Sequence, residues 1–237
     1  MCGFIIHKRD HTAINGMQAI DDIAYRGLRT KYRGYKCYKE YDLMHTALPM
    51  VDPDPDISIQ PIRYGEEPPS VFVGEIFNYK DFGDYPSDAH MIHSMYREEL
   101  SHEFFHKFDG FWSYVTFFND APIAYTDFLG IKPIYYRRDV EVMASEPDVL
   151  KQYGPVTPDA IFHSNVMKWG YDPQGGTPWN EIFQLKPGHF LYKGREYPYW
   201  DWGSVPVTNL YDDLSLSLIH ISEPTRRYAI SYAVFCL

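Results

Sequence analysis

Two patterns of apolar residues alternate along the first hundred residues of the chain. The short apolar run at residues 3–6 predicts a buried strand, and apolar residues at helical spacing predict a helix over residues 15–26. Residues 35–48 are predicted to be extended. After an acidic, proline-rich stretch, residues 71–73 predict another strand, and a helix is predicted to begin at the Ser-Asp pair 87–88, where either side chain can cap it.

The region from residue 111 to residue 144 contains aromatic-rich segments that predict paired strands. Residues 111–118 and 123–127 flank a polar Asn-Asp pair suited to a tight hairpin, and residues 135–138 and 141–144 repeat the arrangement. Aromatic residues occur on both faces of these strands, so a sheet covered on both sides is expected. Paired strands with separate helices favour a layered α+β domain over a parallel βαβ fold.

Composition and charge exclude several classes of function. The 237 residues suffice for one domain and at most part of a second, and a net charge of −10 disfavours binding to nucleic acid. No apolar run reaches the roughly 18–20 residues of a membrane helix and no secretory signal is present, so a cytoplasmic protein without a membrane partner is predicted. The three cysteines lack C-x-x-C spacing, and no metal site is predicted.

Residues 214–237 differ in kind from the rest of the chain. Within them, the sequence LSLIHISEPTR resembles the translation of an adapter used in sequencing libraries. We interpret 214–237 as a non-native tail and exclude it from reasoning about the fold; the alternative is an ordinary C-terminal helix.

Cys2 is the sharpest chemical feature of the sequence. It follows Met1 directly, so removal of Met1 would leave a thiol and a free α-amino group on one residue. An α-amine titrates near about 7.7–8.0 and a thiol near about 8.5, so the amine can take the thiol proton at neutral pH. Cys2 is therefore a candidate N-terminal nucleophile, and the alternative is a small buried cysteine of the first strand.

Further motifs follow Cys2 in a characteristic order. Together with Met1-Cys2-Gly3 they resemble the glutamine amidotransferase domain of the asparagine synthetase family, the class II or N-terminal nucleophile (Ntn) type. The motifs are Tyr25-Arg26-Gly27, His45, Val73-Gly74-Glu75-Ile76-Phe77-Asn78, Ser87-Asp88, Asp109-Gly110, Asp127-Phe128-Leu129-Gly130-Ile131-Lys132-Pro133, Ala144-Ser145-Glu146 and Leu185-Lys186-Pro187-Gly188.

The resemblance implies a fold and a reaction. The implied fold is α+β, a four-layer αββα sandwich of the Ntn-hydrolase type with two mainly antiparallel sheets. In the implied reaction, Cys2 attacks the side-chain amide of glutamine and releases glutamate and ammonia. The family motifs give Gly74 an oxyanion-stabilising N–H. They give Glu75, Asp88 and His45 contacts to the substrate, with His45 two residues before the position of the substrate-binding arginine.

Two positions depart from the family pattern. Val73 stands where the family has an asparagine that donates to the oxyanion, and losing one such donor costs about 10²–10³ in rate. Ala47 stands where the family has the arginine that binds the glutamine carboxylate. A guanidinium suits a carboxylate well, so Arg26, with Arg29 and Arg33, is the candidate replacement. The alternative for these arginines is a solvated basic loop.

The resemblance covers residues 1–202, and residues 203–213 resemble the family's connection into an ATP-dependent synthetase domain. Such a domain, in cis or in trans, is the expected partner. ATP and Mg²⁺ would belong to it, and no cofactor is expected in residues 1–202. The predicted function is glutamine hydrolysis that feeds asparagine synthesis. The alternatives are service to another adenylating enzyme, hydrolysis of another amide, or a catalytically degenerate domain that binds a ligand or supports a partner.

Overall fold

The computed structural model describes residues 2–9, 16–27, 32–48, 54, 57, 59–99, 102–139, 141–201 and 203. The chain divides into two compact units, Met1–Trp200 and Asp201–Leu237. Every described helix and strand belongs to the first unit. The predicted tail at 214–237, and the predicted connection at 203–213 apart from Gly203, lie outside the described residues, so both assignments stay predictions.

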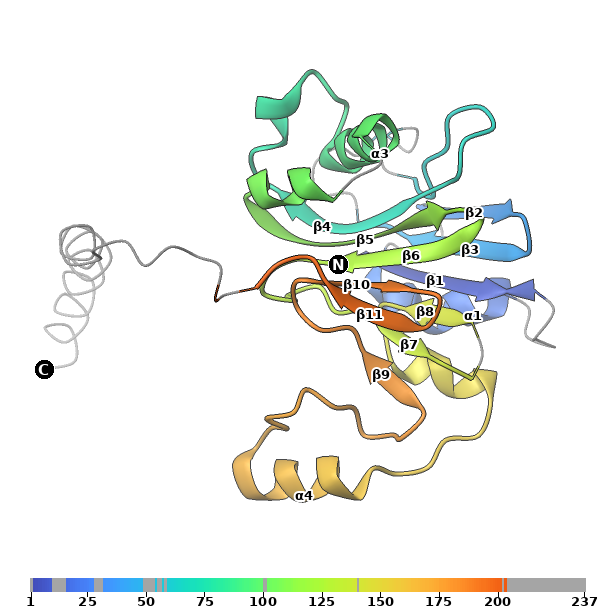
Figure 1. Ribbon diagram of the computed structural model, residues 1–237. Helices are drawn as coiled ribbons and strands as arrows, with labels where there is room; N and C mark the ends of the chain where they lie inside the picture. The colour runs from blue at the N-terminus through green and yellow to red at the C-terminus, as the bar shows by residue number, and fades with distance from the viewer. Residues whose placement is uncertain are drawn as a thin grey trace, which may run out of the picture. The chain divides into compact units, whose positions relative to one another are not determined.

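Two antiparallel sheets form the centre of the first unit (Figure 1). The six-stranded sheet contains, in spatial order, β2 (Arg33–Tyr38), β3 (Tyr41–Thr46), β1 (Gly3–Lys8), β8 (Val142–Ala144), β7 (Tyr135–Arg137) and β9 (Ile182–Gln184). The five-stranded sheet contains β11 (Arg195–Pro198), β10 (His189–Tyr192), β6 (Ala121–Thr126), β5 (Gly110–Phe118) and β4 (Val71–Ile76). β4 is therefore an edge strand, which bears on the site described below.

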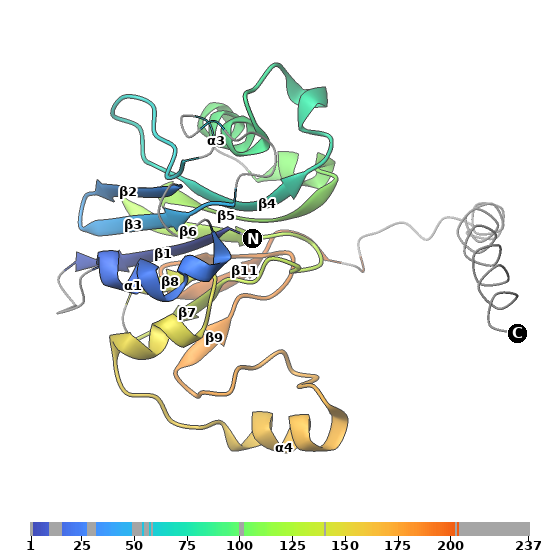
Figure 2. The ribbon, with the colours of Figure 1, turned by 180° about the vertical axis from the view of Figure 1, so that it is seen from behind.

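Helices cover the outer face of each sheet, as Figure 2 shows from behind. α3 (Asp88–Glu99) buries Met91 and Ile92 against the aromatic outer face of the five-stranded sheet. α1 (Gly16–Asp22), followed by the short helix η2 (Ala24–Arg26), packs Ile20 and Ile23 against the six-stranded sheet. The layers run α-β-β-α, so the predicted α+β sandwich with two antiparallel sheets is confirmed.

A third apolar cluster fills the space between the two sheets. Because side chains alternate along a strand, Phe4 and Ile6 of β1 face the other sheet, whereas Ile5 faces α1. The inter-sheet cluster also contains Val73 of β4, and Cys2 packs against its edge. The start of β1 thus places Cys2 at the margin of the inter-sheet core and close to β4.

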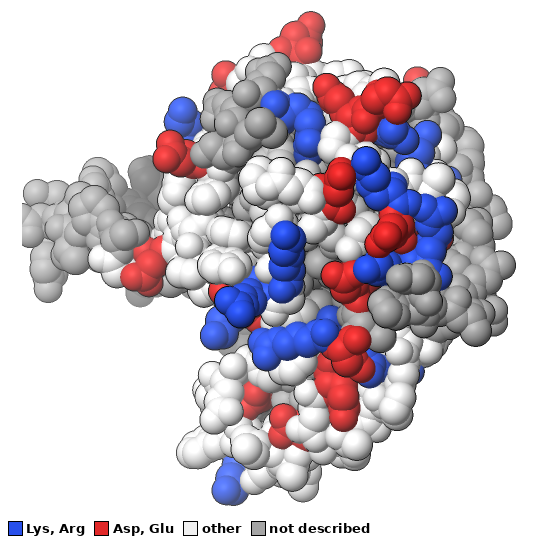
Figure 3. Space-filling view, turned by 45° about the vertical axis from the view of Figure 1, so that its right-hand side comes forward, with Lys and Arg blue, Asp and Glu red and all other residues white. Residues whose placement is uncertain are grey.

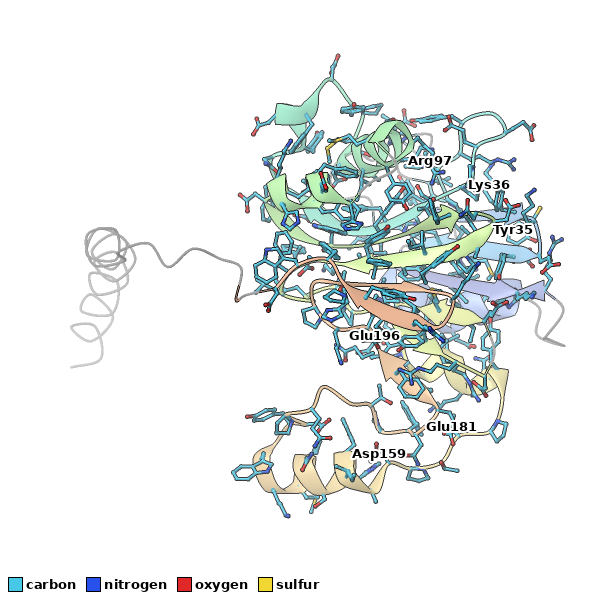
Figure 4. The ribbon with its side chains drawn as sticks, viewed as in Figure 1. Tyr35, Lys36, Arg97, Asp159, Glu181 and Glu196 are labelled. Carbon is cyan, nitrogen blue, oxygen red and sulfur yellow. The ribbon has the colours of Figure 1, made fainter. Side chains whose placement is uncertain are left out.

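The remaining helices are short or peripheral. They are η3 (Tyr79–Phe82), η4 (Glu103–Lys107), η5 (Asp148–Tyr153) and α4 (Ala160–Trp169). Asp159 caps α4 by accepting hydrogen bonds from the N–H groups of Ile161 and Phe162, and Glu181 binds the backbone and hydroxyl of Thr157 just before it (Figure 4). Local polar contacts of this kind, more than burial, hold α4 in place, since none of its residues is buried.

On the face drawn in Figure 3, acidic and basic side chains are intermixed. Within the described ranges, no helix combines the length and the apolar character needed to cross a membrane.

Candidate active site

Cys2 lies directly before β1, with its thiol held by one backbone segment. The Leu48 N–H donates to Sγ at 3.4 Å, and the Leu48 carbonyl oxygen lies 3.8 Å from the same sulfur. Burial raises the pKa of the Cys2 thiol; the charge of Asp88 acts in the same direction, and the Leu48 backbone and the Lys132 ammonium act against it. A thiol with a raised pKa needs a base at hand before it can act as a nucleophile.

Arg26 fixes the backbone of Cys2. Its Nε donates to the Cys2 carbonyl oxygen at 3.1 Å, and its Nη1 donates to the Ser145 carbonyl oxygen at 2.9 Å. The same guanidinium forms an ion pair with Glu146. Ser145 Oγ in turn accepts from the Phe4 N–H at 3.0 Å. Arg26 therefore ties η2 to the start of β1 and to the end of β8, and fixes the backbone position of Cys2.

The backbone of Gly74 points away from its sheet. Its cross-strand partner is Trp112, whose N–H donates to Asp127 Oδ2 at 2.8 Å and whose carbonyl accepts from the Asp127 N–H at 3.0 Å. Both backbone groups of Trp112 are thus engaged on the far side from β4. In an antiparallel ladder this makes Gly74 and Trp112 a non-hydrogen-bonded pair, with the Gly74 N–H directed to the open edge.

The N–H groups of Phe72 and Ile76, two residues before and after Gly74, point to the same edge of β4 and bind side chains there. The Phe72 N–H donates to Gln60 Oε1 at 2.6 Å, and the Ile76 N–H donates to Asp88 Oδ2 at 3.0 Å. The Gly74 N–H lies between these two, and no described residue accepts a hydrogen bond from it. A preorganised backbone N–H of this kind is the usual donor to a developing oxyanion.

Only glycine fits at position 74. Its φ is +143°, and a Cβ there would lie 2.1 Å from the carbonyl oxygen of Phe111. β4 and β5 therefore approach each other closely at this point, and the edge N–H is presented by a backbone that tolerates no side chain.

Asp88 stands at the start of α3 and closes the same edge. Its carboxylate accepts from the Ile76 N–H and, at 2.8 Å, from the Ala89 N–H. Burial raises the pKa of Asp88 to about 6, the two backbone hydrogen bonds oppose this rise, and the nearby Glu75 adds to it. Because Asp88 also acts on the Cys2 thiol, the structure brings Cys2, Gly74, Glu75 and Asp88 to one place.

The comparisons with known proteins agree with this geometry. The model of the family described as glutamine amidotransferase domain matches residues 1–200 of the chain. The chain belongs to this family of glutamine amidotransferase domains. No curated protein gave a significant match.

Two solved structures show the fold of the amidotransferase domain at low sequence identity. The glutamine phosphoribosylpyrophosphate amidotransferase of B. subtilis, complexed with ADP and GMP, matches with a TM-score of 0.55 and 12% identity, over 84% of this chain and 49% of that one. A structure described as the allosteric regulatory enzyme of purine biosynthesis matches with a TM-score of 0.57 and 11% identity, over 81% and 46%. The chain thus spans about half the length of these structures.

His45 lies on β3, in the interior of the amidotransferase domain. Its side chain is completely buried on β3, opposite Phe4 and Gly34 in the strand ladder. Burial lowers the pKa of His45 to about 3, against a smaller effect of the Phe72 backbone, so the imidazole is neutral at physiological pH. The predicted contact of His45 with substrate stays a prediction.

The two departures from the family pattern are both buried. Val73 is 2% exposed and packs in the inter-sheet core, and Ala47 is 2% exposed next to the Leu48 backbone that holds the thiol. Of the candidate replacements for the missing arginine, Arg33 is paired with Asp21 and Arg29 lies outside the described residues. Among the described residues, none of these arginines replaces the missing oxyanion donor at Val73 or the missing carboxylate-binding group at Ala47.

Sequence reasoning did not single out two further groups at the site. One is the backbone of Leu48, which no sequence motif displays. The other is Lys132, whose ammonium lies 4.7 Å from the ring centroid of Phe111 and acts on the Cys2 thiol. Lys132 belongs to the Gly130-Ile131-Lys132-Pro133 motif, so its position was visible although its role was not. In the described part of the chain, no group of three or more His, Cys, Asp or Glu side chains could hold a metal ion.

Proposed function

We propose that this domain hydrolyses glutamine to glutamate and ammonia at Cys2. The observation that carries the proposal is the outward-facing Gly74 N–H, which lies on one strand edge between the Phe72 and Ile76 N–H groups and has no acceptor among the described residues. The edge also holds the carboxylate of Asp88, which acts on the Cys2 thiol. A nucleophile, an oxyanion donor and an anion for an α-ammonium group are the groups that this reaction needs.

The reaction begins once Met1 has been removed. The freed α-amino group of Cys2 takes the thiol proton, and Sγ forms a bond to the side-chain amide carbon of glutamine. The electron pair of the carbonyl moves to oxygen, where the Gly74 N–H stabilises the charge. Collapse breaks the C–N bond, ammonia leaves with the proton from the α-ammonium group, and a thioester remains. Water then attacks the thioester, the C–S bond breaks, and glutamate and the free thiol are restored.

The raised pKa of Cys2 makes the amine necessary in this scheme. At neutral pH a buried thiol is largely protonated, and no described residue donates or accepts at Sγ except Leu48. The α-amine, on the same residue, can reach the sulfur directly. Arg26 contributes by holding the Cys2 carbonyl oxygen, which fixes the orientation of both nucleophile and base.

We propose that Asp88 and Glu75 bind the substrate. The Asp88 carboxylate uses one hydrogen bond per oxygen for the backbone, which leaves lone pairs for an α-ammonium group. Binding a cation beside Asp88 would favour its charged form and offset the cost of burying it. Glu75, half-buried on β4, is the polar wall of the same place.

For the fate of the ammonia, we propose an ATP-dependent synthetase domain of the asparagine synthetase type. The motifs from Cys2 to Gly188 support this acceptor, and ATP and Mg²⁺ would bind in the synthetase domain. Another adenylating enzyme is the alternative acceptor.

An intact mass measurement tests the proposed function. We expect the purified protein to lack Met1 and to gain one adduct with an electrophilic glutamine analogue, such as a diazoketone. Prior incubation with glutamine should slow the labelling. Cys37→Ser is the matched control, because Cys37 is exposed and its removal should leave the adduct in place. Retained Met1, or a processed chain that resists the analogue, contradicts glutamine hydrolysis at Cys2.

The buried Val73 and Ala47 favour one rival, a degenerate domain that keeps the fold without the chemistry. Val73→Asn together with Ala47→Arg should raise the rate of glutamine hydrolysis roughly 10-fold or more, because one oxyanion donor alone is worth about 10²–10³. Burying the new amide in the Val73→Asn change costs about 1–3 kcal/mol and burying an unpaired guanidinium at position 47 costs more, so thermal unfolding must be followed alongside. A folded double variant with unchanged activity would mean that the pocket serves another ligand.

A further inference from the structure

Lys132 is a cation at the site that forms no ion pair with any residue that the structure describes. The ion pairs of described lysines involve Lys8, Lys39 and Lys151, not Lys132. Its ammonium rests instead over the ring of Phe111, at 4.7 Å from the centroid. Phe111 lies directly opposite Glu75, the neighbour of Gly74, in the pairing of β4 with β5, so the ammonium lies over the strand residue that faces Glu75.

The charge of Lys132 acts on the same sulfur as the charge of Asp88. Both alter the pKa of the Cys2 thiol, in opposite directions. The nucleophile therefore has one anion and one cation within electrostatic range. A zwitterionic α-amino acid presents an ammonium and a carboxylate on one carbon, and it needs one partner of each sign.

The other candidate cations are occupied or absent. The guanidinium of Arg26 is bound to the Cys2 and Ser145 carbonyl oxygens and to Glu146. Arg33 is paired with Asp21 at the surface. Position 47, which carries the carboxylate-binding arginine in the family that the sequence resembles, holds a buried alanine. Among the described residues near Cys2, Lys132 is therefore the cation whose side chain can bind an anionic ligand group.

We propose that Lys132 binds the α-carboxylate of the substrate, while Asp88 binds its α-ammonium group. Lys132 thereby determines specificity for an α-amino acid amide. The inference rests on the proposed function and names a residue for it. When the site is empty, a cation–π contact keeps the ammonium over Phe111, opposite Glu75 in the β4–β5 ladder. An ammonium on a flexible stem can then leave the ring and meet a carboxylate as a point charge.

The test compares two substrates in three variants. Glutamine is compared with L-glutaminamide, in which a neutral carboxamide replaces the α-carboxylate, and ammonia release is measured. Lys132→Met keeps the length of the stem over Phe111 and removes the charge. We expect it to lower kcat/KM for glutamine roughly 10- to 100-fold, mainly through KM, and to change kcat/KM for L-glutaminamide less than about 3-fold.

Two further variants serve as controls. Lys132→Arg keeps a cation and should retain most of the preference for glutamine. Lys168→Met removes the same charge from the exposed lysine of α4 and should leave both substrates unaffected. Thermal unfolding of each variant checks that the fold is intact.

The outcomes separate this inference from the proposed function. If Lys132→Met leaves the KM for glutamine unchanged, or lowers kcat equally for both substrates, carboxylate binding by Lys132 is wrong while glutamine hydrolysis stands. If the parent protein neither hydrolyses glutamine nor reacts with the electrophilic analogue, the proposed function is wrong and this inference falls with it.

Discussion

Replacing Cys2 by alanine is expected to abolish glutamine hydrolysis while leaving the domain folded. The thioester cannot form without Sγ, and removing the nucleophile of a covalent mechanism lowers kcat by at least about 10³-fold. The structural cost is small, because the substitution deletes one heavy atom at the margin of the inter-sheet core. We expect the free energy of unfolding to fall by about 1 kcal/mol or less. Glutamate release and thermal unfolding provide the two measurements.

Cys37→Ala is the matched control for loss of a thiol. Cys37 is exposed on β2, away from the Leu48 backbone that holds Cys2, so its loss should change neither glutamate release nor stability. The assignment of Cys2 would be wrong if Cys2→Ala still released glutamate at the parent rate. A large fall in the unfolding temperature of Cys2→Ala would mean instead that the thiol is a structural part of the core.

The periodic elements of the fold could be predicted from the sequence because their side chains face a core. β1, β4, α3 and the β5–β6 hairpin were predicted at or near their observed positions. Residues 35–48, predicted only to be extended, form the two strands of a hairpin, β2 and β3. Successive residues of β1, β4 and β5 are buried, so their apolar residues form short continuous runs, whereas α3 repeats apolar residues at helical spacing.

The segment from α4 to β11 could not be predicted in this way. α4 has no buried residue, so no core imposes a periodic pattern on it, and it is fixed by the Asp159 cap and by Gly170 in the left-handed conformation. β9 has three residues and β10 and β11 have four each, too few for a period to be distinguished. These elements depend on contacts with strands that are distant in sequence.

For the candidate site, the sequence predicted which side chains lie there but not which backbone groups do. Cys2, Gly74, Glu75 and Asp88 were named from motifs and lie together. The pairing of Trp112 with Asp127 is what shows that the Gly74 N–H is not used within the sheet. The contact of Leu48 with the Cys2 thiol involves only backbone atoms of Leu48. Neither can be seen in residue types. Arg26 was predicted as a contact to substrate, and the structure shows its contacts to the Cys2 backbone.

Gly74→Ala is expected to damage stability and activity together. The added Cβ would meet the Phe111 carbonyl oxygen at 2.1 Å, and a φ of +143° is strained for any residue with a side chain. Backbone strain costs about 1–3 kcal/mol and the overlap about 1–3 kcal/mol more, so the free energy of unfolding should fall by about 2–6 kcal/mol. Any movement of β4 that relieves the overlap turns the Gly74 N–H away from its place, and kcat should fall roughly 10²-fold or more.

Gly65→Ala separates the two contributions to this loss. Gly65 also has a positive φ, +54°, but a Cβ there has no atom within 4 Å, so its replacement carries the conformational cost alone. We expect the free energy of unfolding of that variant, measured in urea, to fall by about 1 kcal/mol, and its activity to be unchanged. If Gly74→Ala proves as stable and as active as Gly65→Ala, the close approach of β4 to Phe111 is relaxed at no cost. The oxyanion donor would then have to be sought elsewhere than at the edge of β4.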